Sequence, residues 1–352
     1  MRIHNFAAGP CTLPLEVLEE ARDEFVDYHG AGASLVEMSH RSPEYEAVHT
    51  EALALARKIA GAPDDFEVLF LQGGATLQFA MVPMNLGGPA AFSITGSWSK
   101  KAISDAAHSV ATAVAWDGGP GYTRMPSADE LVVPEASRYL HICSNETIGG
   151  IRYSEWPDVG TPLVVDMSSE YLSRPIPWGL VDVVFGGVQK NLGPSGLAIV
   201  YVRKSVLEDA PDLAAYLSYA THATGRSLHN TPPVFSIWMT GKVLKWLDDR
   251  GGTKALEADA AAKSSIIYDA IDESGGYFRS PVDVVSRSHM NVVFRLPDED
   301  LEKAFVAEAA DRGMANLKGH RSVGGIRASI YAAMPGDGVR ALADFMREFA
   351  GR

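Results

Sequence analysis

The segment VDVVFGGVQKNLGPSG, residues 181–196, decides the fold and raises the first question about chemistry. It begins with apolar residues that favour β-structure, passes through two glycines to Lys190, and ends in a second glycine-rich turn. Burial of an unpaired charge is costly, so a lysine placed here either reaches the surface or shifts its pKa and is used. The segment therefore predicts a buried strand followed by a turn that presents an amine.

Apolar segments followed by polar or glycine-rich turns recur along the chain, in residues 67–86, 90–107, 138–150, 162–169, 180–190 and 196–204. Strands that are apolar throughout are typical of a mainly parallel sheet with helices on both faces. In such sheets ligands bind beyond the carboxyl ends of the strands. The polar residues at or just after such ends are Thr76, Trp98, Thr147, Asp166 and Lys190. The sequence therefore predicts an α/β fold whose site gathers these side chains.

The sequence pattern of the C-terminal third predicts a second domain. Residues 235–272 are expected to be helical and to connect the two parts of the chain. After them, the pattern predicts strands at 289–296 and 324–331 and amphipathic helices at 298–313 and 336–350. We expect a large domain over residues 15–255 and a small α+β domain made of residues 1–14 and 256–352.

Composition narrows the possible functions. The net charge of −13 argues against a nucleic-acid partner, because binding to phosphate backbones needs a basic face. Cys11 and Cys143 are the only cysteines, which excludes a disulfide framework and a cysteine-based zinc site. No apolar run approaches the roughly 20 residues that span a bilayer, and the N-terminus lacks a signal-peptide pattern. These features predict a cytoplasmic protein with no membrane partner and no metal.

Lys190 and Asp166 together suggest one cofactor. A lysine amine with a lowered pKa can form a Schiff base with an aldehyde. Asp166 ends the apolar segment PLVVD, where a carboxylate could keep a heteroaromatic nitrogen protonated. Pyridoxal 5′-phosphate needs both groups. Taken singly, the lysine could equally be a strand-end residue that reaches solvent, and the aspartate could be a turn residue.

Other segments offer sites for anions and for a flat ring. QGGATLQF (72–79) places glycines, Ala75 and Thr76 at a strand-to-helix turn, which suits a phosphate, although glycine-rich turns are common. Trp98 could stack on a pyridine ring, and Thr147 could reach its phenolic oxygen. Paired histidine and arginine suit a phosphate, and a separate arginine suits a carboxylate, although such residues are more often solvated surface. These candidates are His40, Arg41, His320, Arg321 and Arg327.

The order and spacing of these motifs resemble the phosphoserine aminotransferase family, among the class V aminotransferases and the fold-type I pyridoxal-phosphate enzymes. The resemblance covers essentially the whole chain, through NFAAGPCTLP (5–14), MSHRSPEY (38–45), LQGGATLQF (71–79), TGSWSKKA (95–102), SNETIGG (144–150), DMSSEYLSRPI (166–176), GGVQKNLGPSG (186–196), LHNTPPVFSIW (228–238) and KGHRSVGGIRASIYAAMP (318–335). It implies a large domain with a mainly parallel seven-stranded sheet. The chain departs from common family residues at Ala75, Thr76, Glu170, Ser195 and Ala332.

The resemblance also implies a role for each site residue. Lys190 would carry the cofactor as a Schiff base, Asp166 would pair with the pyridinium nitrogen, and Trp98 would stack on the ring. Arg327 would hold the substrate α-carboxylate. The remaining cofactor contacts would come from Ala75, Thr76, Thr147, Gln189 and, from the other subunit of a homodimer, Asn230 and Thr231. The substrate phosphate would meet His320 and Arg321, with His40 and Arg41 supplied across the dimer interface.

The reaction that the resemblance implies is a reversible transamination in serine biosynthesis. O-Phospho-L-serine and 2-oxoglutarate would give 3-phosphohydroxypyruvate and L-glutamate, and 4-phosphohydroxythreonine of pyridoxine biosynthesis would be a related substrate. Another fold-type I enzyme stays open, such as an alanine–glyoxylate aminotransferase or a cysteine desulfurase. Neither cysteine fits the desulfurase well. A regulatory protein that binds the cofactor or a phosphorylated metabolite without turnover is the alternative from another class.

Overall fold

A central mixed sheet organises the fold in the computed structural model, which describes residues 2–351. Five neighbouring strands run parallel, and β10 pairs antiparallel with both β2 and β9. This arrangement confirms the predicted α/β fold with a mainly parallel seven-stranded sheet. In spatial order the strands are β2 (Phe66–Gln72), β10 (Leu197–Arg203), β9 (Val181–Gly187), β8 (Leu163–Asp166), β5 (Tyr139–Cys143), β3 (Ala90–Ile94) and β4 (Thr112–Asp117).

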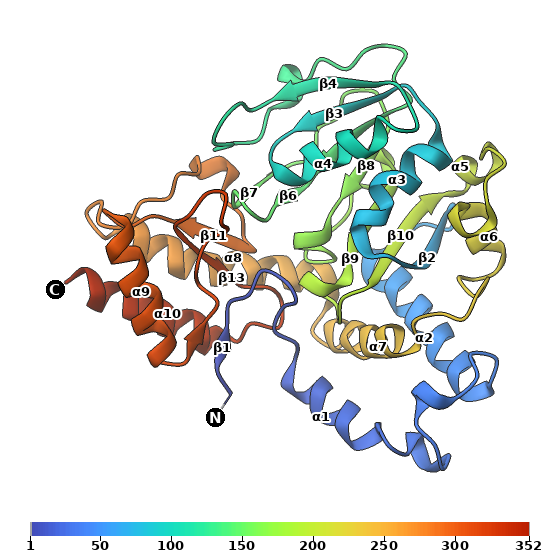
Figure 1. The fold of residues 1–352 in the computed structure, drawn as a ribbon, viewed down its shortest axis with the longest axis horizontal. Coiled ribbons are helices and arrows are strands. Elements are labelled where there is room, and N and C mark those ends of the chain that lie inside the picture. The colour runs from blue at the N-terminus through green and yellow to red at the C-terminus, as the bar shows by residue number, and fades with distance from the viewer. Residues whose placement is uncertain (1, 352) are drawn as a thin grey trace.

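Helices cover both faces of this sheet (Figure 1). Their hydrophobic contacts place α2 and α7 on one face and α3 and α4 on the other. In chain order the α-helices are α1 (Leu15–Glu24), α2 (Pro43–Ala60), α3 (Gly74–Leu86), α4 (Ser97–Ala106), α5 (Lys204–Glu208), α6 (Tyr219–Thr224), α7 (Val234–Asp248), α8 (Gly252–Asp272), α9 (Glu299–Asp311) and α10 (Gly336–Ala350). The short 3-10 helices include η4 (Ser168–Glu170) and η6 (Val188–Lys190).

The two-residue period of a strand divides the sheet's side chains between two cores. In β10, Ile199 and Tyr201 belong to the core shared with α2 and α7, whereas Val200 and Val202 belong to the core shared with α3 and α4. Both sets are fully buried. This double burial explains why the strand sequences are apolar throughout instead of alternating with polar residues.

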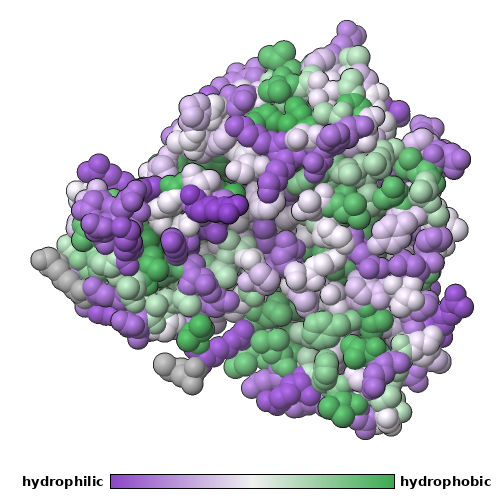
Figure 2. All heavy atoms as spheres, viewed as in Figure 1, coloured by the Kyte–Doolittle hydropathy of each residue, from purple (hydrophilic) through white to green (hydrophobic). Residues whose placement is uncertain are grey.

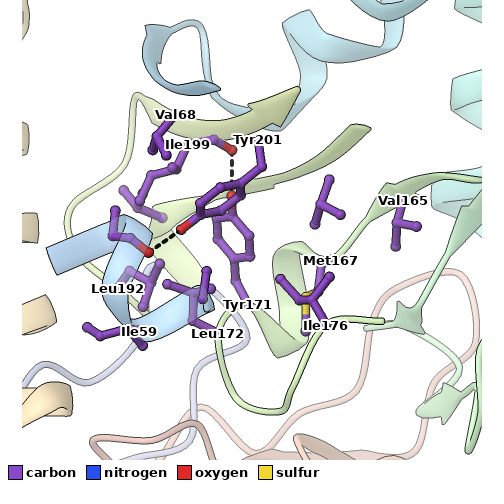
Figure 3. Close-up of a cluster of buried hydrophobic side chains, with 14 of the residues drawn as sticks. Ile59, Val68, Val165, Met167, Tyr171, Leu172, Ile176, Leu192, Ile199 and Tyr201 are labelled. Carbon is purple, nitrogen blue, oxygen red and sulfur yellow. Dashed lines mark hydrogen bonds between the residues drawn. The ribbon is translucent and has the colours of Figure 1, made fainter. Parts of the chain in front are cut away.

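Tyr171 anchors the chain between β8 and β9 inside the first core (Figure 3). Its hydroxyl donates to the Ile199 carbonyl at 2.6 Å, and the Tyr201 hydroxyl donates to the Ala56 carbonyl at 2.8 Å (Figure 3). A Cβ on Gly186 would lie 2.6 Å from the Tyr171 ring, which is closer than side chains approach. The first glycine before Lys190 is therefore required by the packing of Tyr171.

The C-terminal part forms its own core, built mainly from α8, α9, α10 and the strands β11 and β13. Phe6, from the N-terminal segment, is also buried in this core. The remaining strands are β1 (His4–Asn5), β6 (Asn145–Glu146), β7 (Ile151–Arg152), β11 (Asn291–Phe294), β12 (Met314–Ala315) and β13 (Ile326–Ser329). The domain boundaries proposed from the sequence stay a prediction, which this second core supports.

Two features differ in detail from the sequence-based expectation. The helical region 235–272 is divided into α7 and α8, because Gly251 adopts a left-handed φ of 94° between them. The edge strand β4 was not predicted, since its residues are mostly half-buried or exposed and carry a weaker apolar signal.

Within residues 2–351, no helix is long and apolar enough to cross a membrane, and no group of acidic, histidine or cysteine side chains is arranged to hold a metal.

Candidate active site

A cavity of about 220 Å³ lies beyond the carboxyl ends of the sheet strands. It lies where the turns after β2, β3, β8 and β9 meet, as expected for an open α/β sheet. Most of the residues predicted to bind the cofactor line it, namely Ala75, Thr76, Trp98, Asp166, Gln189 and Lys190. The sequence-predicted convergence of strand-end residues is therefore present in the structure.

Lys190 ends the 3-10 turn that follows β9, and only 8% of its surface is exposed. Its Nζ donates to Thr147 Oγ1 at 2.6 Å and lies 4.8 Å from the centre of the Trp98 ring. Burial lowers the pKa of the Lys190 ammonium, while the negative charge of Asp166 opposes this change. An amine with a lowered pKa is available as a nucleophile and as a base.

Asp166 is the last residue of β8 and is buried beside the cavity. Its Oδ1 accepts hydrogen bonds from Ser168 N at 2.9 Å and from Ser168 Oγ at 2.5 Å. Burial raises the pKa of the Asp166 carboxyl, while the charge of Lys190 and the Ser168 bonds oppose this change. Ser168 Oγ in turn accepts from Gly187 N at 3.1 Å, which connects Asp166 to the turn that carries Lys190.

The turn between β2 and α3 also lines the cavity. Gly73 and Gly74 adopt φ angles of 90° and 60°, which other residues rarely do, and α3 begins at Gly74. The first N–H groups of a helix have no partner within the helix and favour an anion. Gln189 also lines the cavity, and its buried Oε1 has no hydrogen-bond partner among the described residues.

The predicted carboxylate-binding arginine lies on β13 of the C-terminal part and reaches the same site. Arg327 Nη1 donates to the Thr147 carbonyl at 3.5 Å, so Thr147 contacts both Lys190 and Arg327. His320 lies close enough that the charges of Arg327 and Arg321, after burial, lower its pKa. The structure thus brings Arg327 to the lysine through Thr147, while His320 interacts with the charge of Arg327.

Glu146 has no role in the sequence-based prediction, although it precedes Thr147 in the SNETIGG motif. The structure buries its carboxylate and sets it against the N-terminus of α4, where it accepts from Trp98 N at 3.2 Å, Ser99 N at 3.0 Å and Ser99 Oγ at 2.8 Å. A Cβ on Gly96 would overlap this carboxylate. Glu146 therefore positions Trp98. The sequence shows an acidic residue in a segment expected to be buried, which could have indicated a role for Glu146. It does not show that Trp98 and Ser99 are the residues that bind this carboxylate.

Besides Thr147, His320, Arg321 and Arg327, four more predicted site residues do not line the cavity. His40 and Arg41 lie in the turn before α2, while Asn230 and Thr231 lie in the segment between α6 and α7. The Thr231 carbonyl accepts from Gln72 Nε2 at 3.4 Å, at the end of β2. Their predicted roles depend on a second subunit and stay predictions.

Comparison with known proteins places the chain in a family. The family model described as Aminotransferase class-V matches residues 3–342. The chain belongs to the class-V aminotransferase family. With its fold-type I architecture, it is a pyridoxal-phosphate-dependent aminotransferase.

Full-length relatives share close to half of the sequence of this aminotransferase. The phosphoserine aminotransferase of Niallia circulans is 49% identical, with 99% of this chain and 98% of the relative covered. That of Geobacillus kaustophilus is 47% identical, with 100% and 99% covered. Among solved structures, the phosphoserine aminotransferase of Bacillus circulans subsp. alkalophilus has a TM-score of 0.97 at 48% identity over 99% of both chains. The pyridoxal-phosphate-bound enzyme of Trichomonas vaginalis has a TM-score of 0.94 at 36% identity, over 98% of this chain and all of the other.

The cavity of this aminotransferase fits pyridoxal phosphate. It offers a buried amine, a buried carboxylate, an indole and a helix N-terminus around one space. Among residues 2–351, no hydrogen bond reaches Asp166 Oδ2, and Gln189 Oε1 and Trp98 Nε1 are buried without partners. These are the groups that an aldehyde, a protonated ring nitrogen, an aromatic ring and a phosphate require.

Proposed function

We propose that this aminotransferase acts on O-phospho-L-serine and 2-oxoglutarate and forms 3-phosphohydroxypyruvate and L-glutamate. The observation that carries the proposal is the double contact of Thr147, which touches the buried amine of Lys190 and the guanidinium of Arg327. A substrate carboxylate held by Arg327 would bring its Cα near Lys190 Nζ. The names of the full-length relatives support phosphoserine as the amino donor.

We propose that Lys190 holds the cofactor covalently through Nζ and that Asp166 pairs with the ring nitrogen. Trp98 would stack on the ring, and Thr147 would reach the phenolic oxygen. The phosphate would meet the N-terminus of α3 and the residues Ala75, Thr76 and Gln189, with Asn230 and Thr231 of the partner subunit. When bound, pyridoxal phosphate supplies an aldehyde that takes the amino group and a ring that takes up electrons from the broken Cα–H bond.

The residues of the chain would then act by orienting the substrate and moving one proton. Arg327 binds the α-carboxylate bidentately, which fixes the direction of the Cα–H bond. Lys190 Nζ, once the substrate amine has displaced it from the cofactor, would accept the proton from Cα, and burial lowers the pKa of this amine. His320 and Arg321, with His40 and Arg41 from the partner subunit, would bind the phosphate or the distal carboxylate of glutamate.

We also propose that the protein is a cytoplasmic homodimer. His40 and Arg41, which do not line the cavity of their own chain, would then act in the active site of the other copy. Exposed apolar residues around α1 and on α7 support an interface. Phe25 and Phe235 contact each other at 6.3 Å between ring centres yet stay exposed, and Leu15 and Val26 are exposed nearby in sequence.

The proposed function predicts strong selection for the phosphate group. We expect kcat/KM with O-phospho-L-serine to exceed kcat/KM with L-alanine by roughly 10²- to 10⁴-fold, because two or more charge-assisted hydrogen bonds are lost without the phosphate. Glutamate formation with 2-oxoglutarate as acceptor measures both rates. Equal rates for the two amino donors would contradict the proposed substrate, and 4-phosphohydroxythreonine can be compared in the same assay.

A further inference from the structure

Lys101 on α4 presents a second ammonium group to the ring that lines the cavity. It follows Trp98 by three positions, which places the two side chains on one face of the helix. Its Nζ lies 4.5 Å from the centre of the Trp98 ring, and Lys190 Nζ lies 4.8 Å from the same centre. The ammonium of Lys101 therefore lies against a ring that lines the cavity, on an exposed side chain.

Lys101 has no acidic partner among residues 2–351, and the same holds for His320, Arg321 and Arg327. These four cations therefore add positive charge to the site region in a chain with 44 acidic and 31 basic residues. The neighbouring Lys100 differs, because its ammonium lies 5.0 Å from the centre of the Tyr122 ring and interacts with the charge of Asp117. The two adjacent lysines therefore face different surroundings.

The charges of these cations interact between α4 and the C-terminal part of the chain. The positive charge of Lys101 adds to those of Arg327 and Arg321 in lowering the pKa of His320, after burial. Figure 2 shows hydrophilic surface over α4 and on the neighbouring edge of the C-terminal part. Like charges that face each other without a carboxylate repel, so an anion placed between them is bound favourably.

We propose that Lys101 binds the phosphate group of the substrate from the α4 side, opposite His320 and Arg321. This inference rests on the proposed function. It adds a residue that would make the enzyme select phosphorylated substrates. A phosphate carries close to two negative charges at neutral pH, and a distal carboxylate carries one. A lysine is a flexible point charge, so it gains more from the dianion than from the smaller monoanion.

The test compares the Lys101→Gln and Lys100→Gln variants of the full-length holoenzyme, which lose the same charge at adjacent positions. For Lys101→Gln we expect KM for O-phospho-L-serine to rise about fivefold to tenfold, with kcat within about twofold of wild type. KM for L-glutamate in the reverse direction should change less than about twofold. Lys100→Gln should leave both KM values unchanged, and Lys101→Arg should restore the wild-type KM.

Three results would overturn the inference. Equal increases in KM for Lys101→Gln and Lys100→Gln would indicate a general charge effect. Equal changes for phosphoserine and glutamate, or a shifted visible absorption band in Lys101→Gln, would indicate that Lys101 acts through Trp98. An unchanged KM would remove Lys101 from the site. A failure of the proposed function can be distinguished from a failure of this inference. In the first case the wild-type protein would turn over L-alanine as well as O-phospho-L-serine.

Discussion

Replacement of Lys190 by alanine is expected to lower transamination of O-phospho-L-serine by at least about 10⁴-fold, because one side chain would supply both covalent attachment and proton transfer. The amine is buried, is held by Thr147 at 2.6 Å, and has a pKa lowered by burial. No other described lysine lines the cavity. Single-turnover formation of the keto acid measures the loss directly.

Two controls make the Lys190 result specific. Lys100→Ala removes a lysine of α4 that faces Tyr122 and should keep wild-type turnover. Thermal unfolding of Lys190→Ala should show no loss of stability, since removal of a buried amine also removes its desolvation cost. Retention of more than about one hundredth of wild-type turnover by a folded Lys190→Ala variant would contradict its assigned role.

Replacement of Asp166 by asparagine is expected to lower kcat by about 10³-fold, because the side chain keeps its shape but loses the charge opposite the ring nitrogen. Asparagine Oδ1 can still accept from Ser168 N and Ser168 Oγ, so the local fold should persist. Ser168→Ala removes one of these bonds and leaves the charge, so its kcat should fall only about tenfold. Steady-state rates at saturating cofactor measure both variants.

The exposed Asp129→Asn variant is the matched control for loss of a carboxylate, and it should behave as wild type. A kcat for Asp166→Asn within about tenfold of wild type would show that the carboxylate does not act on the ring. A larger loss in Ser168→Ala than in Asp166→Asn would also contradict the assignment, because the hydrogen bond would then matter more than the charge.

Much of the fold was predictable because strands that are buried on both faces of the sheet have apolar residues at nearly every position. The strands β2, β3, β5, β8, β9 and β10 are nearly continuous apolar runs, and the predicted site residues that line the cavity each lie at the end of one of them or in the turn or helix that follows it. Helices α9 and α10 were predicted from their amphipathic pattern, and the helix at α9 ends before Gly313, which has a φ of 78°. The edge strand β4 left a weaker record because only Ala115 in it is buried.

The site was predictable where a residue follows a strand and was missed where its role depends on a distant partner. Lys190 and Asp166 could be identified because each is a charged residue at or just after the end of an apolar run. Glu146 is defined by its bonds to Trp98 and Ser99, which lie far away in the sequence. Lys101 and Lys100 look alike in the sequence, and only the structure shows that one faces Trp98 and the other Tyr122.

The central claim is that Lys190 holds pyridoxal phosphate through Nζ. Its most direct test is reduction of the purified holoenzyme with borohydride, which makes a lysine–cofactor link permanent, followed by proteolysis and mass mapping of the modified peptide. We expect the added phosphopyridoxyl mass on the peptide that contains Lys190, and on Lys190 within it. Modification of another lysine, such as Lys101 or the buried Lys263, or no modification of a protein supplied with cofactor, would contradict the claim.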